Sequence, residues 1–203
     1  MPFIRKIAVV PAILFAAFAM AGTSGACAQT AAILVPGAGG PGPYDFLIRN
    51  RNRFSSAGIE TFVATSAQEA ASLVQSLKSQ RRKAVIVGMS RGGIATARAL
   101  ASGAPASGVV FVSSNFRAVR RQLGSQGNLP PALIVHHRRD GCRPTTPSNV
   151  ASFAAWARGK VRVAWFDNSG QEARNPCGPR GAHGFFMNDS GPVSAIIGFV
   201  RSR

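Results

Sequence analysis

The residues best suited to covalent chemistry in this sequence centre on Ser90, within the G-M-S-R-G segment at 88–92, a G-x-S-x-G motif. The motif follows an apolar run at 84–88 and precedes a helical pattern. A turn from a strand into a helix is so tight at such a motif that only glycine fits two positions before and after the serine, whose hydroxyl is lifted to the head of the helix. We therefore predict that Ser90 is a nucleophile. The competing interpretation is a glycine-rich turn that only packs a helix against a strand.

A carboxylate and an imidazole follow two later apolar runs. Asp140 comes after the run at 132–136, and His183 lies in a Gly- and Pro-rich loop beyond the run at 161–166. When a serine, a histidine and a carboxylate lie in line, the histidine takes the serine proton and the acid orients the imidazole. The chain order Ser, Asp, His is the order found when the three residues follow successive strands of a parallel α/β sheet. Asp140 as a simple turn former before a glycine is the alternative, and Asp167 is a weaker candidate for the acid.

The other two histidines in the sequence, His136 and His137, stand at a strand end, where we favour packing and hydrogen bonding over catalysis. An oxyanion hole is predicted from the backbone N–H groups of Arg91 and Ala38, since Ala38 lies in a glycine-rich loop after the first apolar run. A phosphate-binding loop is the competing interpretation. The G-A-G-G-P-G stretch at 37–42 has the glycine spacing of a G-x-G-x-x-G loop, and no G-x-x-x-x-G-K-[ST] pattern is present. The phosphate-binding interpretation is disfavoured because Pro41 and Pro43 interrupt the loop and no suitable acid ends the second apolar run.

The N-terminal segment has the pattern of an export signal. Arg5 and Lys6 precede an apolar run at 7–21, and the small residues A-C-A at 26–28 suit cleavage after Ala28. We expect residues 1–28 to be removed, leaving a domain at 29–203 in the bacterial periplasm or outside the cell. The alternatives are a retained anchor and a lipoprotein acylated on Cys27. No later segment is long and apolar enough to cross a bilayer.

Export would place the two remaining cysteines, Cys142 and Cys177, in a compartment where disulfides persist, so we predict a bridge between them. That bridge would tie the Asp140 loop to the His183 loop. Free buried thiols are the alternative. A metal site is disfavoured because the two cysteines lack a metal-binding spacing and paired histidines nearby, and we expect neither a metal nor an organic cofactor.

The excess of basic over acidic residues indicates which kinds of molecule the protein could bind. The sequence has 24 Lys and Arg against 7 Asp and Glu, a formal charge of +17, which falls to +15 without residues 1–28. Such a domain should contact anionic surfaces non-specifically. Aromatic residues are only 8% of the chain, with a single tyrosine, so stacking surfaces for a specific nucleic acid are scarce. A catalytically silent cationic binding domain remains a second hypothesis.

Apolar runs and helical patterns alternate along the chain and predict the fold. We expect buried strands at 31–35, 59–64, 84–88, 108–112, 132–136 and 161–166, and helices at 68–79, 94–102, 150–156 and 193–200, with a short helix within 116–131. Near-continuous apolar strands are typical of a parallel sheet covered on both faces. The prediction is a doubly wound α/β domain of about six strands with helices on its flanks.

The elbow at 88–93, the Asp140-Gly141-Cys142 loop and the segment from Cys177 to Phe185 resemble the α/β-hydrolase superfamily, in particular its small exported members. The resemblance covers essentially all of 29–203. It implies Ser90 as nucleophile, Asp140 as acid, His183 as general base and the loop around Ala38 as oxyanion site. This sequence departs from the family in lacking two N-terminal strands, a histidine before Gly37 and a cap domain. We expect hydrolysis of small carboxylic esters, or of an exposed acyl group, through an acyl-enzyme; peptidase or amidase activity on the same residues is the alternative.

Overall fold

A computed structural model of the chain describes residues 30–167 and 174–203. The expected cleavage site after Ala28 lies outside these residues. The described part contains a six-stranded sheet in which every neighbouring pair of strands is parallel, in the order β2-β1-β3-β4-β5-β6. The strands are β1 (Ala31–Val35), β2 (Thr61–Val63), β3 (Ala84–Met89), β4 (Gly108–Val112), β5 (Ala132–His137) and β6 (Val161–Phe166). The predicted doubly wound α/β architecture is confirmed.

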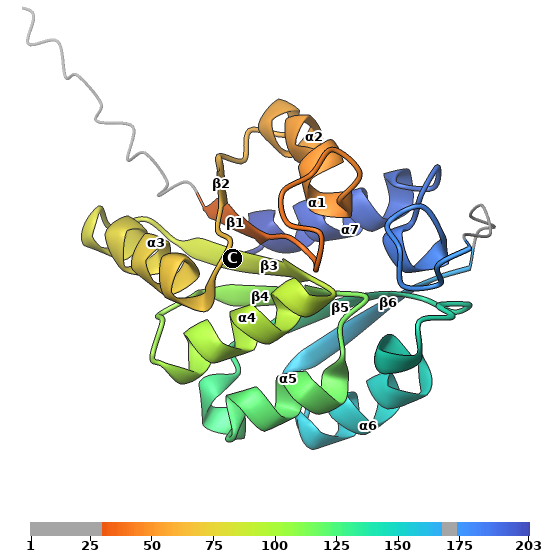
Figure 1. The fold of residues 1–203 in the computed structure, drawn as a ribbon. Helices are drawn as coiled ribbons and strands as arrows, with labels where there is room; N and C mark the ends of the chain where they lie inside the picture. The colour runs from red at the N-terminus through yellow and green to blue at the C-terminus, as the bar shows by residue number, and fades with distance from the viewer. Residues whose placement is uncertain (1–29, 168–173) are drawn as a thin grey trace, which may run out of the picture.

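Helices cover both faces of the sheet (Figure 1). Helices α3 (Ala67–Ser79), α4 (Arg91–Ala101), α5 (Phe116–Leu123) and α6 (Ser148–Trp156) pack on one face. Helices α1 (Phe46–Arg49), α2 (Arg51–Ser56) and α7 (Ser190–Arg201) pack on the other. Short 3-10 turns occur at Gln126–Asn128, Arg143–Thr145 and Ala182–Gly184.

Alternating side chains of each strand supply two separate cores. In β1, Ile33 and Val35 point into the core beneath α3 to α6, whereas Leu34 points into the core beneath α1, α2 and α7. Because both faces of the central strands are buried, these strands need apolar residues at every position rather than at alternate ones. That is the pattern from which the sheet was predicted.

The outermost strand β6 departs from the prediction that every strand is buried. Most of its residues are only half-buried, and Arg162 is exposed. The reason is its place in the sheet, since β6 has a neighbour, β5, on one side only. At the opposite edge β2 is shorter than the predicted 59–64, although Ile59 and Ala64 are still buried.

Helices α1 and α2 were not predicted. Helix α1 has four residues and α2 has six, which is too short for a helical periodicity to show in the sequence, and Pro41 and Pro43 precede them. Asp45 nevertheless begins α1 as its N-cap, with its carboxylate accepting hydrogen bonds from the N–H groups of Leu47 and Ile48.

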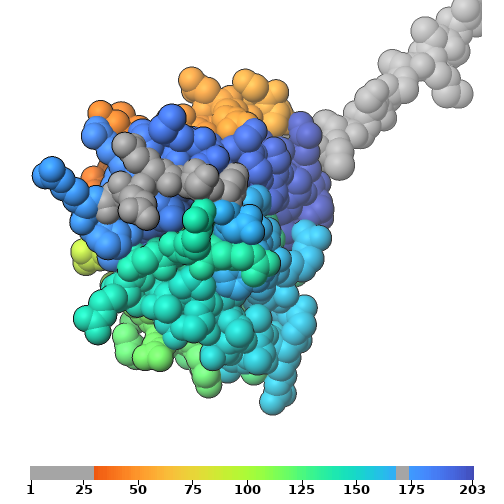
Figure 2. Space-filling view, turned by 90° about the vertical axis from the view of Figure 1, so that its right-hand side faces the viewer, coloured from red at the N-terminus to blue at the C-terminus, as the bar shows by residue number. Residues whose placement is uncertain are grey.

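The segments that follow β5 and β6 lie together in space. In the face turned toward the viewer in Figure 2, teal and light-blue atoms, which follow β5, make up most of the lower half, and the blue C-terminal segment lies directly above them. The loops after β1, β3 and β5 also emerge at one edge, because the strands are all parallel. This edge gathers the residues that the sequence singled out.

Candidate active site

Ser90 occupies a sharp turn between β3 and α4. Its backbone has φ 51° and ψ −115°, a conformation that residues with a side chain rarely adopt. The positions two residues before and after Ser90 must be glycine because neither has room for a side chain. A Cβ on Gly92 would overlap the carbonyl oxygen of Val35, and a Cβ on Gly88 would lie 2.7 Å from the Cα of Gly93. The turn therefore has the build expected of a nucleophile elbow.

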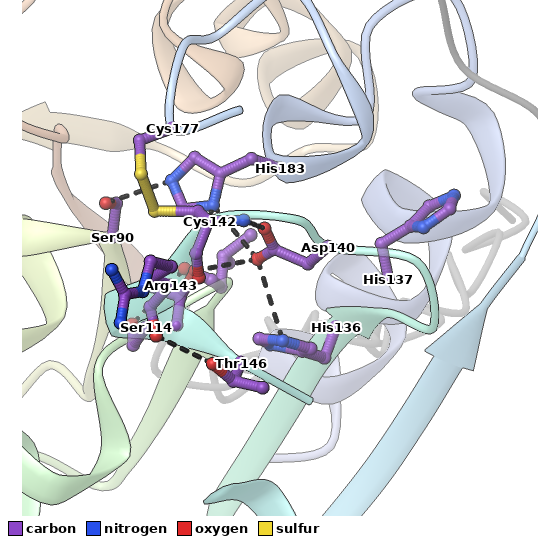
Figure 3. Close-up of polar contacts among 12 residues, drawn as sticks. Ser90, Ser114, His136, His137, Asp140, Cys142, Arg143, Thr146, Cys177 and His183 are labelled. Carbon is purple, nitrogen blue, oxygen red and sulfur yellow. Dashed lines mark hydrogen bonds and ion pairs between the residues drawn. A yellow bond between two sulfur atoms is a disulfide. The ribbon is translucent and has the colours of Figure 1, made fainter. Parts of the chain in front are cut away.

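His183 lies beside this serine. Its Nε2 is 3.0 Å from Ser90 Oγ, and its Nδ1 is 2.9 Å from Asp140 Oδ2 (Figure 3). His183 is 2% exposed and Asp140 is 5% exposed, so water is largely kept from both groups. The structure thus brings the three predicted residues into one hydrogen-bonded chain from hydroxyl to imidazole to carboxylate.

The carboxylate of Asp140 is fixed by its own loop. Oδ1 accepts a hydrogen bond from the N–H of Cys142 at 3.0 Å, and Oδ2 accepts one from the Thr145 hydroxyl at 2.9 Å. Thr145 Oγ1 is also 3.2 Å from His183 Nδ1, so this buried threonine contacts both partners of the acid–base pair. Sequence reasoning missed Thr145, and its only signal is a hydroxyl five residues after the candidate acid.

The rival acid Asp167 and the histidine His137, for which we expected packing, both lie apart from this chain of hydrogen bonds. Asp167, the rival acid, is exposed after the end of β6, and its backbone oxygen accepts a hydrogen bond from Arg139. The side chain of His137 points away from Asp140 and packs against Phe185.

His136 is fully buried between the rings of Phe116 and Trp165, and its Nε2 is 3.6 Å from Asp140 Oδ2. Burial lowers the pKa of His136 to about 4, because the apolar surroundings disfavour the charged imidazolium, although the nearby Asp140 carboxylate opposes this shift. At neutral pH His136 is therefore an uncharged ring packed behind the carboxylate.

The predicted disulfide between Cys142 and Cys177 is present. Cys142 is buried in the loop that carries Asp140, while Cys177 lines the cavity in front of Ser90. Figure 3 shows the bridge beside His183, so it joins the loop that carries Asp140 to the loop that carries His183.

The loop after β1 lies close to Ser90. A Cβ on Gly37 would lie only 3.5 Å from Ser90 Cβ, and Ala38 lines the same cavity as Ser90 and His183. Arg91 is the first residue of α4, where backbone N–H groups have no acceptor within the helix. The two predicted oxyanion donors thus belong to segments that border the serine.

Asp45 holds this loop in place, and sequence reasoning missed it. Its Oδ2 accepts a hydrogen bond from the N–H of Gly37 at 2.9 Å, while its Oδ1 caps α1. Burial raises the pKa of Asp45, and the backbone hydrogen bonds and Arg49 oppose the shift. An aspartate directly before an apolar helical turn is the signal that could have identified the cap.

Arg49 joins three segments of the site. Its guanidinium donates hydrogen bonds to the carbonyl oxygens of Tyr44 and Gly184, and it forms an ion pair with Asp189. Tyr44 belongs to the cavity wall, and Gly184 follows His183 directly. Arg49 therefore links α1, the cavity wall and the histidine loop.

The cavity in front of Ser90 has a volume of about 250 Å³ and a mainly apolar wall. Its lining includes Tyr44, Phe46, Met89, Pro179 and the glycines between 37 and 42. A cavity of this size accepts a small apolar group, with Ser90 and His183 at its boundary.

The side chains of Asp140, Cys142 and His183 place three atoms of metal-ligand type within 4.8 Å of one another. These atoms already have other partners. The Cys142 sulfur is bonded to Cys177, and the His183 nitrogen nearest Asp140 is hydrogen-bonded to it. The group fits a hydrogen-bonded pair next to a disulfide better than a metal site.

No model of a protein family matches the sequence, and no curated protein matches it. Solved structures do match. An esterase from Pyrococcus furiosus aligns with a TM-score of 0.64 at 12% identity, covering 86% of this chain and 82% of that one. A monoacylglycerol lipase from Paleococcus ferrophilus aligns at 0.59 and 13%, covering 86% and 96%. An esterase from Exiguobacterium antarcticum aligns at 0.59 and 9%, covering 85% and 92%.

Within the described residues, no helix combines the length and the apolar character needed to span a membrane.

The structural similarity to these solved proteins extends over most of this chain and of each matched chain, and the low sequence identities mean that it shows the fold alone. Taken with the parallel six-stranded sheet and its order, it establishes that this chain has the α/β-hydrolase fold.

Proposed function

We propose that this protein is a serine esterase that hydrolyses small carboxylic esters through an acyl-enzyme on Ser90. The observation that carries the proposal is the hydrogen-bonded chain from Ser90 Oγ through His183 to Asp140 at the boundary of an apolar cavity. The matched esterases and the lipase, which share its fold, support ester hydrolysis as the reaction class.

In the proposed reaction, Ser90 Oγ attacks the ester carbonyl carbon while His183 Nε2 takes the hydroxyl proton. Asp140 keeps the Nδ1 proton of the imidazole in place and stabilises the positive charge that develops on the ring. The N–H groups of Arg91 and Ala38 would receive the oxyanion, a contribution of several kcal/mol in comparable sites. His183 then gives its proton to the departing alcohol, and water releases the acid by the same steps.

We also propose that the protein is exported, with residues 1–28 removed. The disulfide between Cys142 and Cys177 supports export, because such bridges form and persist outside the reducing cytoplasm. The sequence of the mature N-terminus, determined on protein recovered from the native cell, tests this proposal. A chain that begins after Ala28 supports it, whereas a chain that keeps Met1 and remains in the cytoplasm contradicts it.

The esterase proposal is tested with p-nitrophenyl esters of graded acyl length. Replacement of Ser90 by alanine should lower kcat by about ten-thousand-fold or more, because the covalent step disappears. Ser107→Ala is a matched control, since the Ser107 hydroxyl bonds the Ala84 carbonyl at the other end of β3. Both variants should keep the folded-state circular dichroism. Hydrolysis retained by Ser90→Ala would contradict the proposal, and cleavage of peptide anilides in preference to esters would redirect it to a peptidase.

A further inference from the structure

The mouth of the cavity carries an arginine stacked on an aromatic ring. The guanidinium carbon of Arg180 lies 3.8 Å from the ring centroid of Tyr44, which lines the cavity and is 48% exposed. A guanidinium stacked on a ring is held in one plane at little cost, while its N–H groups stay free to donate at the edges of that plane. Pro179, the residue before Arg180, also lines the cavity. The Arg180 charge is therefore fixed at the rim.

The N–H donors of Arg180 have no acceptor among the residues that the structure describes. Within residues 30–167 and 174–203, Arg180 forms neither a hydrogen bond nor an ion pair, and its stack on Tyr44 is its only specific contact. Arg49, which also contacts Tyr44, differs from Arg180 in this respect. Its guanidinium N–H groups donate to the carbonyl oxygens of Tyr44 and Gly184 and to the carboxylate of Asp189. Arg49 supports the wall, whereas Arg180 places a guanidinium with no ion-pair partner in the described part of the chain next to two residues of that wall, Tyr44 and Pro179.

Among the described residues that line the cavity, little negative charge is available to oppose Arg180. The acidic side chain in the cavity lining is Asp45, and its carboxylate is engaged by the N–H groups of Gly37, Leu47 and Ile48. Exposed Arg91 adjoins the serine in the chain. In a molecule with 24 basic and 7 acidic residues, the potential at the mouth is therefore positive.

We propose that the substrate of this site is an ester that carries an anionic group, a carboxylate or a phosphate, and that Arg180 determines this specificity. This substrate class rests on the proposed esterase function. The apolar interior takes the part of the substrate next to the reacting carbonyl, while the anionic group stays at the mouth against the N–H edge of Arg180. A planar guanidinium binds carboxylate and phosphate oxygens in pairs, which adds orientation to the attraction.

The test compares esters that differ only in charge, in two pairs. On the acyl side, the p-nitrophenyl half-ester of glutaric acid is compared with the same compound carrying a terminal amide. On the alcohol side, 4-acetoxybenzoate is compared with 4-acetoxybenzamide. The quantity measured is the ratio of kcat/KM for the anionic ester to that for its neutral partner. The pair that shows the preference identifies which half of the substrate carries the anionic group.

In the wild-type protein at low salt the ratio should exceed one for at least one pair. Arg180→Gln should lower that ratio about three- to tenfold, the range expected for one charge-assisted contact at a partly solvated site. Arg180→Lys should keep part of it, because the charge remains while the planar donor pair is lost. Raising the salt concentration from ~20 to ~500 mM should lower the wild-type ratio by screening.

The matched control is Arg120→Gln. Arg120 is also exposed and lies over an aromatic ring, that of Trp156, at 5.5 Å, on helix α5 of the other layer. Its replacement removes the same charge and should leave the ratio as in the wild type. The inference is overturned if neutral esters are hydrolysed but the ratio is the same with and without Arg180, or if Arg120→Gln lowers it equally. Absence of turnover for every ester would instead contradict the esterase proposal itself.

Discussion

Ser90 combines backbone strain with a hydrogen-bonded side chain, and both follow from the residues around it. The positive φ of 51° is held because the N–H of Ser90 bonds the Val112 carbonyl at 2.8 Å and because glycines at 88 and 92 allow the chain to pass closely. Strain of this kind persists only where the surroundings enforce it. Here it points the hydroxyl at His183 rather than into the sheet.

Thr145 offers the sharpest test of how the acid is held. Thr145→Val keeps the shape but removes the hydroxyl that bonds Asp140 Oδ2 and lies near His183 Nδ1. We expect kcat for ester hydrolysis to fall about tenfold, because the carboxylate loses one hydrogen bond that fixes its direction. Thr146→Val is the control, since the Thr146 hydroxyl donates its hydrogen bond to the Arg143 carbonyl rather than to Asp140. Equal activity in the two variants would contradict the role given to Thr145.

His136 predicts a pH dependence of stability. Its pKa of about 4 in the folded protein lies below the ordinary 6.5 that the unfolded chain regains, so between these values the unfolded state binds the extra proton. The free energy of unfolding should therefore be unaffected by His136 above pH 6.5 and should fall as the pH drops toward 4. The loss reaches about 3 kcal/mol.

Urea unfolding of the wild type and of His136→Leu at pH 7 and pH 4 measures this effect. The wild type should lose more stability than the variant over this interval. Asp45, whose raised pKa acts in the opposite direction, is present in both proteins and cancels in the difference. Identical losses in the two proteins would show that His136 does not titrate as described.

The sequence predicts some residues of the site better than others, for physical reasons. Ser90 stands in a motif whose glycines are required by the turn, and the order of Asp140 and His183 follows from parallel topology. Asp45 and Thr145 act through hydrogen bonds made after the chain has folded. An aspartate near prolines or a threonine in a loop is too common for its type alone to indicate such a role.

Among the secondary-structure elements, the strands with continuous apolar runs could be predicted from the sequence, whereas the short helices α1 and α2 could not. The strands at 31–35, 108–112 and 161–166 have the predicted bounds, because an apolar run flanked by turns leaves few alternatives. Helices α1 and α2 were missed because they are short and gain their order from contacts with the sheet and from the Asp45 cap.

The bridge from Cys142 to Cys177 links two loops that the sheet alone does not hold together. Closing a loop with a sequence separation of 35 residues restricts the unfolded chain, which corresponds to about 4 kcal/mol in the chain-entropy description. Because the bridge lies between the Asp140 loop and the His183 loop, we expect its reduction to lower esterase activity before the fold is lost.

Esterase rate and near-ultraviolet circular dichroism, followed together during titration with a thiol reductant, separate these two effects. A thiol count on the untreated mature protein is the accompanying control and should find no free thiol. Activity and tertiary signal that vanish together would contradict a local role for the bridge, and two free thiols in the untreated protein would exclude the bridge itself.

In the molecule as a whole, the excess of basic residues should affect stability as well as the substrate preference proposed above. Few acids are available to balance the arginines, and several are already committed, such as Glu60 to Arg82 and Asp189 to Arg49. Mutual repulsion among the remaining charges should destabilise the folded state at low salt.

Thermal unfolding of the mature protein in ~10 to ~500 mM sodium chloride tests this effect. We expect Tm to rise by several degrees as repulsion is screened, and most of the rise should occur below ~150 mM, where the screening length falls fastest. Sodium sulfate at matched ionic strength controls for specific anion effects. A Tm that stays constant or falls with added sodium chloride would contradict the expectation.

The central claim is that the Ser90 hydroxyl is activated by His183 and attacks a carbonyl. The most direct measurement is labelling of the folded mature protein by a fluorophosphonate, with the modified residue located by peptide mass spectrometry. We expect one adduct, on Ser90, that is absent in Ser90→Ala and forms much more slowly in His183→Ala, whereas Ser107→Ala reacts as the wild type does. Absence of labelling in the folded wild type, or an adduct on another serine, would contradict it.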